Sequence, residues 1–178
     1  YTDDDIARVA QIKRWQQQHL SLEEIRSRLA EADRLPDLAE IARAFVDEGA
    51  KGNFAAAARL VIGADDVGVP LVRIFGEVLM PAMYEVGTRW ANGTLLVAQE
   101  KQFSEVAGEL ITELSRRHLA TEPHLTPIVA ACVKGVRHQL GIRMLVGLLR
   151  AEGYRVHYLG ADVDPQFLLE AVQLHRPK

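Results

Sequence analysis

The sequence lacks the features that mark several classes of protein. Its single cysteine, Cys132, excludes an internal disulfide framework and a zinc site built from several cysteines. No run of about 18 apolar residues occurs, so no membrane-spanning helix is expected. The acidic start of the chain, residues 1–5, is unlike the basic and then apolar start of a secretory signal peptide. We therefore expect a cytoplasmic protein.

Basic charge and catalytic motifs are also missing. The net charge is −3; residues 1–50 carry 7 Lys/Arg against 11 Asp/Glu, and residues 51–178 carry 14 against 13. Neither part has the basic excess of a nucleic-acid-binding surface. The sequence contains no Ser-His-Asp arrangement, paired-carboxylate motif, phosphate-binding loop or zinc-ligand spacing, so nothing in it supports an enzymatic activity.

Apolar residues, by contrast, make up 48% of the chain, and aromatic residues 6%, which suits a helix-rich protein with a sizeable core. Helical spacing of apolar residues predicts a helix over 3–18 and a second over 22–31. Ser21 and Glu24 have the spacing of a capping box at the start of the second helix. Pro36 suits the first turn of the helix that follows.

The stretch from residue 37 to residue 118 has an almost wholly helical pattern. Asn53 is the expected N-cap of the second helix in this stretch, and Pro81 is expected to kink or restart the third. Four helices joined by short loops predict an antiparallel bundle. The expected helices cover 37–48, 54–63, 70–87 and 94–118.

The pattern changes after residue 121. A continuous apolar strand is expected over 128–133, as for a strand covered on both faces. It is followed by a helix, a second strand and a further helix over 139–151, 155–159 and 166–175. This order predicts the start of a doubly wound, Rossmann-like (flavodoxin-like) sheet. Because two strands make a marginal sheet, we expect the natural protein to continue past Lys178.

The predicted fold class is therefore α/β with an all-α part, in three domains. The expected domains are a helical pair over 1–34, a four-helix bundle over 37–121 and a truncated Rossmann-like domain over 126–178.

One histidine stands at a place where such folds bind ligands. His138 follows the predicted strand 128–133 and opens the next helix, so it lies at the carboxyl end of a parallel strand. Gly141, three residues later, lets a large group approach the backbone. The spacing His-x-x-Gly at a strand-to-helix turn resembles the lower-ligand loop of cobalamin-binding domains.

Residues 1–30 resemble the second half of the DNA-binding domain of MerR-family transcriptional regulators. In that family a recognition helix and a wing precede this point, so the resemblance implies DNA binding through a region that this sequence lacks. The matching pattern is Tyr1-Thr2-x-x-Asp5-Ile6-x-x-Val9-x-x-Ile12-Lys13, then Leu20-Ser21-Leu22-x-Glu24-Ile25.

Residues 37–178 resemble the cobalamin-binding module of MerR-type regulators of the CarH/LitR class, which depend on B12 and often respond to light. The resemblance implies a cobalamin cofactor, with adenosylcobalamin favoured, held between the bundle and the Rossmann-like domain. Three segments carry it: Trp90 with Glu100 and Lys101 ten and eleven residues later, the run from His138 to Gly141, and Tyr158-Leu159-Gly160-Ala161-Asp162-Val163, which is typical of the second loop of the corrinoid fold.

The resemblance also implies a role for each of these residues. His138 would be the lower axial ligand of cobalt, since transition metals accept imidazole nitrogen, and Gly141 would let the nucleotide tail pass beside the sheet. Trp90 would pack over the upper ligand. Glu100 would hydrogen-bond the ribose of an adenosyl group, and Lys101 would donate to a ribose or a phosphate.

Three positions depart from the family pattern. Val136 stands where the family has an Asp or Glu two positions before the histidine, and loss of such a partner weakens metal ligation about 10–100-fold. Lys101 replaces the family's histidine after Glu100. Ala91 replaces the histidine that exchanges onto cobalt after photolysis in light-sensing members. Light control is therefore a secondary hypothesis that rests on the family alone.

The same residues have purely structural explanations. A histidine at a helix start is often a cap, Trp90 can belong to the bundle core, and Glu100 and Lys101 can be solvated. Asp162 can simply cap the helix 166–175. The remaining histidines show no convergent partners in the sequence and receive no role: His19, His118, His124, His157 and His175.

The sequence thus predicts a fragment of a transcriptional regulator in which cobalamin binding is coupled to homo-oligomerisation, as a dimer or a tetramer, and to DNA binding. Two alternatives stay open. One is a corrinoid carrier protein of a methyltransferase. The other is a regulator of this fold that does not bind cobalamin and acts through a protein partner or another tetrapyrrole.

Overall fold

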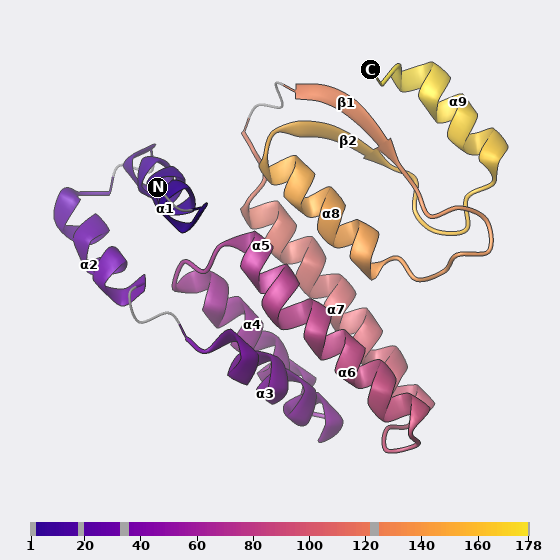
Figure 1. Cartoon of the computed structure of the whole chain (residues 1–178), viewed down its shortest axis with the longest axis horizontal. Helices are drawn as coiled ribbons and strands as arrows, with labels where there is room; N and C mark the ends of the chain where they lie inside the picture. Colours follow the sequence, from indigo (N-terminus) through magenta and orange to yellow (C-terminus); the bar gives the residue numbers. More distant parts are fainter. Residues whose placement is uncertain (1–2, 18–19, 33–35, 122–124, 178) are drawn as a thin grey trace.

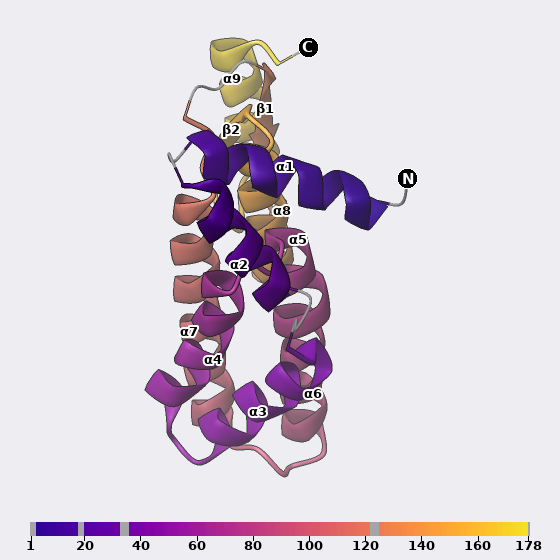
Figure 2. The same cartoon turned by 90° about the vertical axis from the view of Figure 1, so that its left-hand side faces the viewer.

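A computed structural model describes residues 3–17, 20–32, 36–121 and 125–177. The chain begins with two helices, α1 (Asp3–Gln17) and α2 (Leu22–Ala32). The predicted capping box is confirmed, because Glu24 Oε2 accepts from the Ser21 N–H at 2.8 Å and Ser21 Oγ accepts from the Glu24 N–H at 3.3 Å. In Figure 2 the bundle helices run roughly parallel to one another, and α1 crosses their direction.

The bundle consists of four helical rods, as the sequence predicts (Figure 1). Its interior is apolar throughout, and the side chains of Phe45, Phe75 and Phe103 are fully or almost fully buried. Phe103 packs edge-on against Phe54, with ring centroids 5.1 Å apart, and leaves no room for a side chain at Gly49. The rods are α3 (Leu38–Ala50), α4 (Phe54–Asp66), the continuous run of α5 (Leu71–Arg73), η1 (Ile74–Leu79) and α6 (Met80–Ala91), and α7 (Val97–Arg117).

The third rod passes Pro81 without restarting and runs on to Ala91, four residues beyond the predicted end at Gly87. A π-helical stretch, η1, precedes the proline, and the Met80 N–H bonds to the carbonyl of Phe75 five residues back. A proline lacks the N–H of a regular helix and its ring crowds the preceding turn. The wider π turn accommodates both effects, so the rod remains unbroken.

Other boundaries also differ from the sequence expectation. Helix α4 extends to Asp66 rather than ending at residue 63. Asn53 occupies its N-cap position, but its side chain makes no cap bond and instead donates to Glu48 Oε2 at 3.0 Å. Helix α7 begins at Val97 rather than residue 94, because the Gln99 side chain accepts from the Leu96 N–H at 2.9 Å and fixes the start there.

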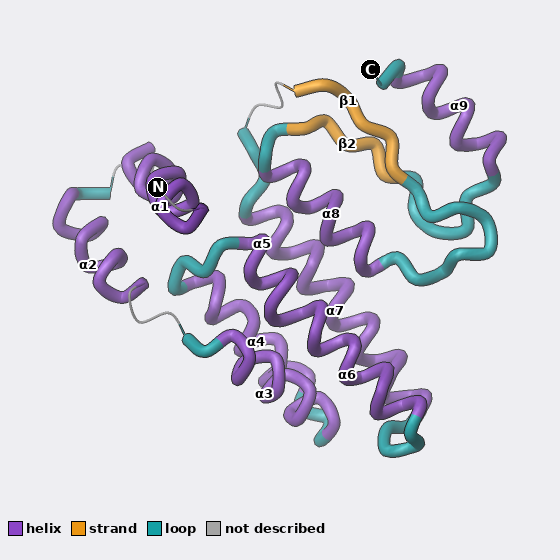
Figure 3. Tube along the Cα trace, viewed as in Figure 1, coloured by secondary structure: helices purple, strands orange, loops and turns teal. Residues whose placement is uncertain are grey.

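The sheet region contains β1 (Leu125–Ala130), α8 (Leu140–Ala151), β2 (Tyr154–Tyr158) and α9 (Pro165–His175). The two strands lie side by side (Figure 3), and they are parallel, with Ile128 opposite Val156. β1 ends three residues before the predicted Val133, which instead forms an isolated bridge to Val163. The residues of β1 from Pro127 to Ala130 are half-buried, whereas coverage on both faces was expected.

Helix α8 joins the two parts of the molecule by packing against α7 on one side and the sheet on the other. Small residues make this contact possible: a methyl group at Gly147 would overlap Ser115 Oγ of α7. Arg143 crosses from α8 to α7 and donates to the Gly108 carbonyl at 2.7 Å and to Thr112 Oγ1 at 2.6 Å. Among the helices described, none is long and apolar enough to cross a membrane.

Candidate functional site

Two loops meet at the carboxyl end of the sheet, one after β1 and one after β2. The first loop donates to the second through the Cys132 N–H, which bonds to the Gly160 carbonyl at 2.9 Å. The second returns two bonds, from the Asp162 N–H to the Val136 carbonyl at 3.2 Å and from the Val163 N–H to the Cys132 carbonyl at 2.9 Å. These contacts hold residues 131–139 and 159–164 as one surface.

Asp162 does not cap the helix after β2, which was the structural explanation that the sequence offered for it. Its backbone is left-handed, with φ 57°, and its Oδ1 accepts from the Gly135 N–H at 2.7 Å. The cap of α9 is Asp164, whose Oδ1 accepts from the Gln166 N–H at 3.0 Å. That bond and the Lys134 ammonium, 3.0 Å away, lower the pKa of Asp164 below its ordinary value. Asp162 therefore ties the two loops together rather than capping a helix.

His138 lies near the end of the first loop with its side chain exposed. Its backbone carbonyl lies 3.7 Å from the buried Cys132 Sγ, which anchors the loop beneath it. Within the described part of the chain no hydrogen bond or ion pair engages its imidazole ring. The position two residues earlier is Val136, so no carboxylate from there orients the ring. Both ring nitrogens remain open to an external ligand or metal.

The surface around this histidine fits a flat apolar macrocycle with a metal at its centre. Val133, Val136 and Leu159 belong to the same two loops and are 55%, 42% and 36% exposed. Gly160, at φ 94°, keeps the second loop free of a side chain. Gly141, the second residue of α8, has no neighbouring atom within 4 Å of where a Cβ would stand. An open imidazole among exposed apolar side chains and bare glycines suits a corrin ring.

The bundle residues singled out in the sequence lie at the turn between α6 and α7. Trp90 is 49% exposed, so it is not part of the bundle core, and the neighbouring Leu96 and Val97 are also exposed. Glu100 accepts from Ser104 Oγ at 3.1 Å and lies 3.2 Å from the Lys101 ammonium. In Figure 1 this turn lies at the lower tip of the bundle, and the two sheet loops lie higher, beyond the start of α8. No hydrogen bond joins the two groups in the described residues.

Support for the first loop comes from two residues to which the sequence analysis assigned no role, although both lie in segments that carry the resemblance. Tyr158, at the end of β2, donates its hydroxyl to Gln139 Oε1 at 3.1 Å. Burial is the main cause that raises the pKa of Tyr158, so the hydroxyl stays protonated and remains a donor. This bond fixes the residue that follows His138. The sequence signal that could have indicated this role is the position of an aromatic residue, Tyr158, near the end of the second predicted strand.

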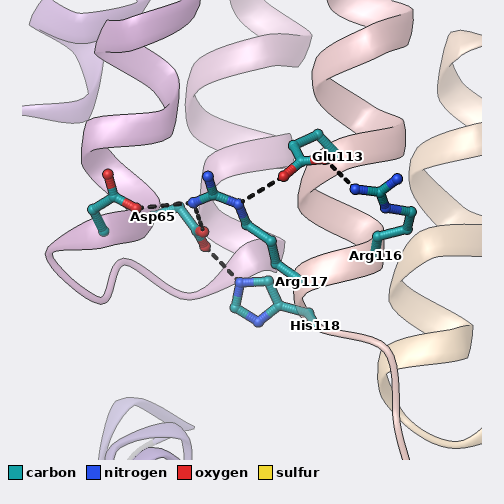
Figure 4. A network of polar contacts seen from close by, with 6 residues as sticks. Asp65, Glu113, Arg116, Arg117 and His118 are labelled. Carbon is teal, nitrogen blue, oxygen red and sulfur yellow. Dashed lines mark hydrogen bonds and ion pairs between the residues drawn. The ribbon is translucent and has the colours of Figure 1, made fainter.

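Three of the histidines without assigned roles do have partners, contrary to the sequence expectation. His118 Nε2 lies 2.5 Å from Asp65 Oδ1, and Figure 4 shows this pair beside Arg117, which also contacts Asp66 and Glu113. Burial alone would raise the pKa of Asp65, but His118 and Arg117 outweigh it and hold that pKa below its ordinary value.

The other two of these histidines stack on each other. The rings of His157 and His175 are 3.5 Å apart between centroids, with an interplanar angle of 10°. His19 and His124 lie outside the described residues. No sequence pattern indicates the pairing of His118 with Asp65 or of His157 with His175, because each pairing joins two elements that are separated along the chain.

Comparison with known proteins identifies B12 binding domains in both parts of the chain. Residues 38–115 match a family model described as a B12 binding domain, and residues 126–178 match a second model of the same description. The chain is 30% identical over 203 residues to the HTH-type transcriptional repressor CarH of Myxococcus xanthus, covering 99% of this chain and 63% of the repressor. The two matched ranges correspond to the bundle and to the sheet region.

Corrinoid proteins form a second group of relatives. The methanol–corrinoid protein of Methanosarcina barkeri is 27% identical over 114 residues, which cover 64% of this chain and 44% of that protein. The structure of the monomethylamine corrinoid protein from the same species has a TM-score of 0.63 at 23% identity, covering 76% of this chain and 64% of that chain. The chain spans less than two thirds of the length of each of these relatives. The structural likeness confirms the predicted fold, a helix bundle followed by a Rossmann-like sheet.

Proposed function

We propose that this chain is the ligand-sensing part of a MerR-type transcriptional regulator and binds cobalamin, with adenosylcobalamin favoured, between the bundle and the sheet loops. His138 would ligate the cobalt from the side of the sheet loops. The observation that carries the proposal is the open imidazole of His138 on a loop pair fixed by four hydrogen bonds, in a chain whose two parts match B12 binding domains. We assign no enzymatic activity to the chain.

Each side of the site contributes a different property. Cobalamin, when bound, would supply a cobalt ion that accepts an imidazole nitrogen. The sheet loops offer one imidazole and the apolar surface of Val133, Val136 and Leu159. The α6–α7 turn offers the exposed indole of Trp90, which would exclude water from the face of the cofactor opposite His138. It also offers the Glu100 carboxylate, which suits ribose hydroxyls. A ligand that contacts both sides favours one arrangement of bundle and sheet.

The regulatory part of the proposal rests on the repressor relative, which aligns along 99% of this chain. A cobalamin-dependent arrangement of the two parts would set the homo-oligomer, and the oligomer would place paired DNA-binding regions on paired half-sites. The corrinoid relatives favour the carrier alternative, in which the chain presents a methylated corrinoid to a methyltransferase.

The direct test is the visible spectrum of the protein after desalting with adenosylcobalamin, methylcobalamin or hydroxocobalamin. Wild type should retain the cofactor with the bands of histidine ligation, and His138→Ala should lose those bands. His175→Ala is the matched control, because that ring stacks on His157 and lies outside the proposed site. Failure of the wild-type protein to retain any cobalamin would favour the regulator that uses another ligand.

A gain of affinity tests the ligation geometry from the other direction. Val136→Asp introduces a carboxylate two residues before His138, where it can orient the second ring nitrogen. Because such a partner strengthens metal ligation about 10–100-fold, the dissociation constant for hydroxocobalamin should fall by that order. Val133→Asp, in the same loop but at another register, should give no such gain.

Oligomer size separates the regulator from the carrier. The regulator should change its assembly state when adenosylcobalamin is added in the dark, as measured by light scattering after size exclusion.

Illumination of the complex tests light control. An unchanged spectrum and an unchanged oligomer size would remove that hypothesis, as Ala91 suggests. Methyl transfer from methylcobalamin-loaded protein to a partner methyltransferase would instead support the carrier.

A further inference from the structure

We propose that the cleft between α7 and α8 is a second ligand site, for a small anion with an apolar body such as an aromatic carboxylate. The cleft has a volume of about 410 Å³, which lies within the range of about 300–1,000 Å³ for ligand pockets. Trp90, Glu100 and His138 do not line it. Its walls come from both parts of the molecule and include Ile111, Ser115 and Leu119 from the bundle side and Gln139, Val146 and Tyr158 from the sheet side.

Positive charge gathers at this cleft. Arg116, Arg143 and Arg150 line it and no acidic residue does, although the chain as a whole carries a net charge of −3. Arg143 donates to a carbonyl and a hydroxyl, and Arg150 donates to the Val156 carbonyl at 2.8 Å. These acceptors are uncharged, and no ion pair of either guanidinium group is found among the described residues. Arg143 also lines an adjoining hollow with Glu105, Glu109 and Glu113, so Arg150 is the guanidinium group farther from acidic side chains.

The third arginine extends the positive edge of the cleft. Arg116 Nη2 donates to Glu113 Oε2 at 2.8 Å, and its side chain is 72% exposed. Figure 4 shows it on the side of α7 that faces α8. A surface ion pair of this kind is weak, so the arginine remains available to an entering anion. Guanidinium groups suit carboxylates, because their planar donors match the two oxygens.

Hydrogen-bonding capacity is also left over in the cleft. The Ser115 hydroxyl oxygen is buried and is the one side-chain atom of its kind without a hydrogen-bond partner in the described residues. Buried polar groups are nearly always paired. This hydroxyl packs against Gly147, so a rotation of the Ser115 side chain into the cleft would bring it to a ligand carboxylate, which would supply the missing partner.

The rest of the lining decides the class of ligand. Ile111, Leu119 and Val146 provide apolar walls, against which a fully hydrated inorganic ion would gain little. A carboxylate that carries one aromatic ring or a branched aliphatic chain fits both the walls and the volume. Such a ligand would contact α7 and α8 together and stabilise the joint between bundle and sheet.

The probe for the test is 4-phenylbutyrate, with neutral 4-phenylbutanamide as its isostere, titrated into the whole chain. We expect NOEs from the phenyl ring to the methyl groups of Ile111 and Leu119. The amide should bind with an affinity at least about tenfold lower than that of 4-phenylbutyrate, because its binding lacks the charge-assisted hydrogen bonds. Equal binding of the two compounds, or the absence of these NOEs, would overturn the proposal.

Variants test the cationic groups. Arg116→Met should weaken 4-phenylbutyrate binding about tenfold without affecting the fold, since this side chain is mostly exposed. Arg150→Met should have at least the same effect, and its thermal unfolding midpoint checks that the protein is folded. Arg59→Met, on the exposed side of α4, is the matched control and should leave binding unchanged. A similar loss in all three variants would contradict a localised site.

A last arm separates this ligand from the cofactor, because cobalamin carries a phosphodiester of its own and cobinamide lacks the nucleotide that contains it. Bound 4-phenylbutyrate should persist in the presence of either compound. Displacement by adenosylcobalamin but not by cobinamide would show that the cleft holds the cofactor's nucleotide, which overturns a separate site. If the chain binds no cobalamin at all, the NOE result still decides the proposal.

Discussion

The bundle and the sheet region bury their apolar residues to very different depths. The bundle core contains many fully buried side chains, among them Phe45, Phe103, Ile111 and Leu114. Among the described residues of the sheet region, the buried apolar ones are Cys132, Met144, Val146, Val156 and Ala171, and none of these is fully buried. The strand β1 is only half-covered.

The difference in burial indicates that the bundle provides most of the folding stability, whereas the loops of the sheet region are the part open to a ligand. Burial of apolar area is the main source of folding free energy, so the bundle stabilises itself. The sheet region depends on α8, whose Met144 belongs to the bundle core. Its exposed loops then remain available for a ligand, as expected of loops held by a rigid scaffold.

The largest effect should come from the bundle core. Phe103→Ala removes a fully buried ring that packs against Phe45 and Phe54, and should lower the free energy of unfolding by about 3–5 kcal/mol in urea titrations. Phe167→Ala, in α9, removes a ring that is 59% exposed and should cost about 0.5 kcal/mol or less. Comparable losses in the two variants would break the contrast between the regions.

The joint between the regions should come next. Gly147→Ala forces a methyl group into Ser115 Oγ and should cost about 1–3 kcal/mol. Hydrogen exchange should accelerate in β1 and β2 while α3 and α4 keep their protection. Gly141→Ala, on the same helix with open space around it, should leave stability unchanged or slightly higher and affect only cobalamin binding. Loss of protection in α3 would show that the bundle is not independent.

The Asp65 cluster should contribute less, and its contribution depends on pH. Asp65→Asn removes an acceptor shared by Arg117 and His118 and should cost about 1–3 kcal/mol near neutral pH. Because the folded pKa of Asp65 is depressed, this stabilisation is present above the ordinary pKa of 3.8 and is lost as pH falls through the lower folded value.

Asp66→Asn is the matched control for this cluster. The Asp66 side chain is 63% exposed, so its single contact with Arg117 should contribute about 0.5 kcal/mol or less. Thermal unfolding of both variants across the acid range measures the difference. An equal effect of the two substitutions would show that burial of Asp65 adds nothing.

The smallest effect should appear where α9 rests on the sheet. Burial, His175, Arg155 and Arg150 lower the pKa of His157, so the folded state binds this proton less readily than the unfolded state. Docking of α9 should therefore be complete above the ordinary pKa of 6.5 and weaken as pH falls below it. Hydrogen exchange of α9 should show this acceleration, and His157→Phe should suppress it.

Most of the helices could be predicted because their apolar spacing and caps are local properties of the sequence, as at Ser21 and Glu24. The end of β1 could not, because the strand ends where its pairing with β2 ends, at Ala130 opposite Tyr158, and Val133 pairs separately with Val163 thirty residues later. The continuity of the helix across Pro81 was not predicted either, because a proline inside a helical pattern is consistent with a kink or a restart, and only the structure shows the π-helical turn before it.

The sequence by itself determined the order of the elements, the place of His138 at the end of a strand and the glycines beside it, because periodicity and turn chemistry are written in neighbouring residues. Only the tertiary structure decided what those residues face. In the folded chain the His138 ring is open, Asp162 joins two loops, and three arginines line one cleft. Contacts between residues far apart in the chain depend on how α7, α8 and the sheet pack, and no local pattern encodes that packing.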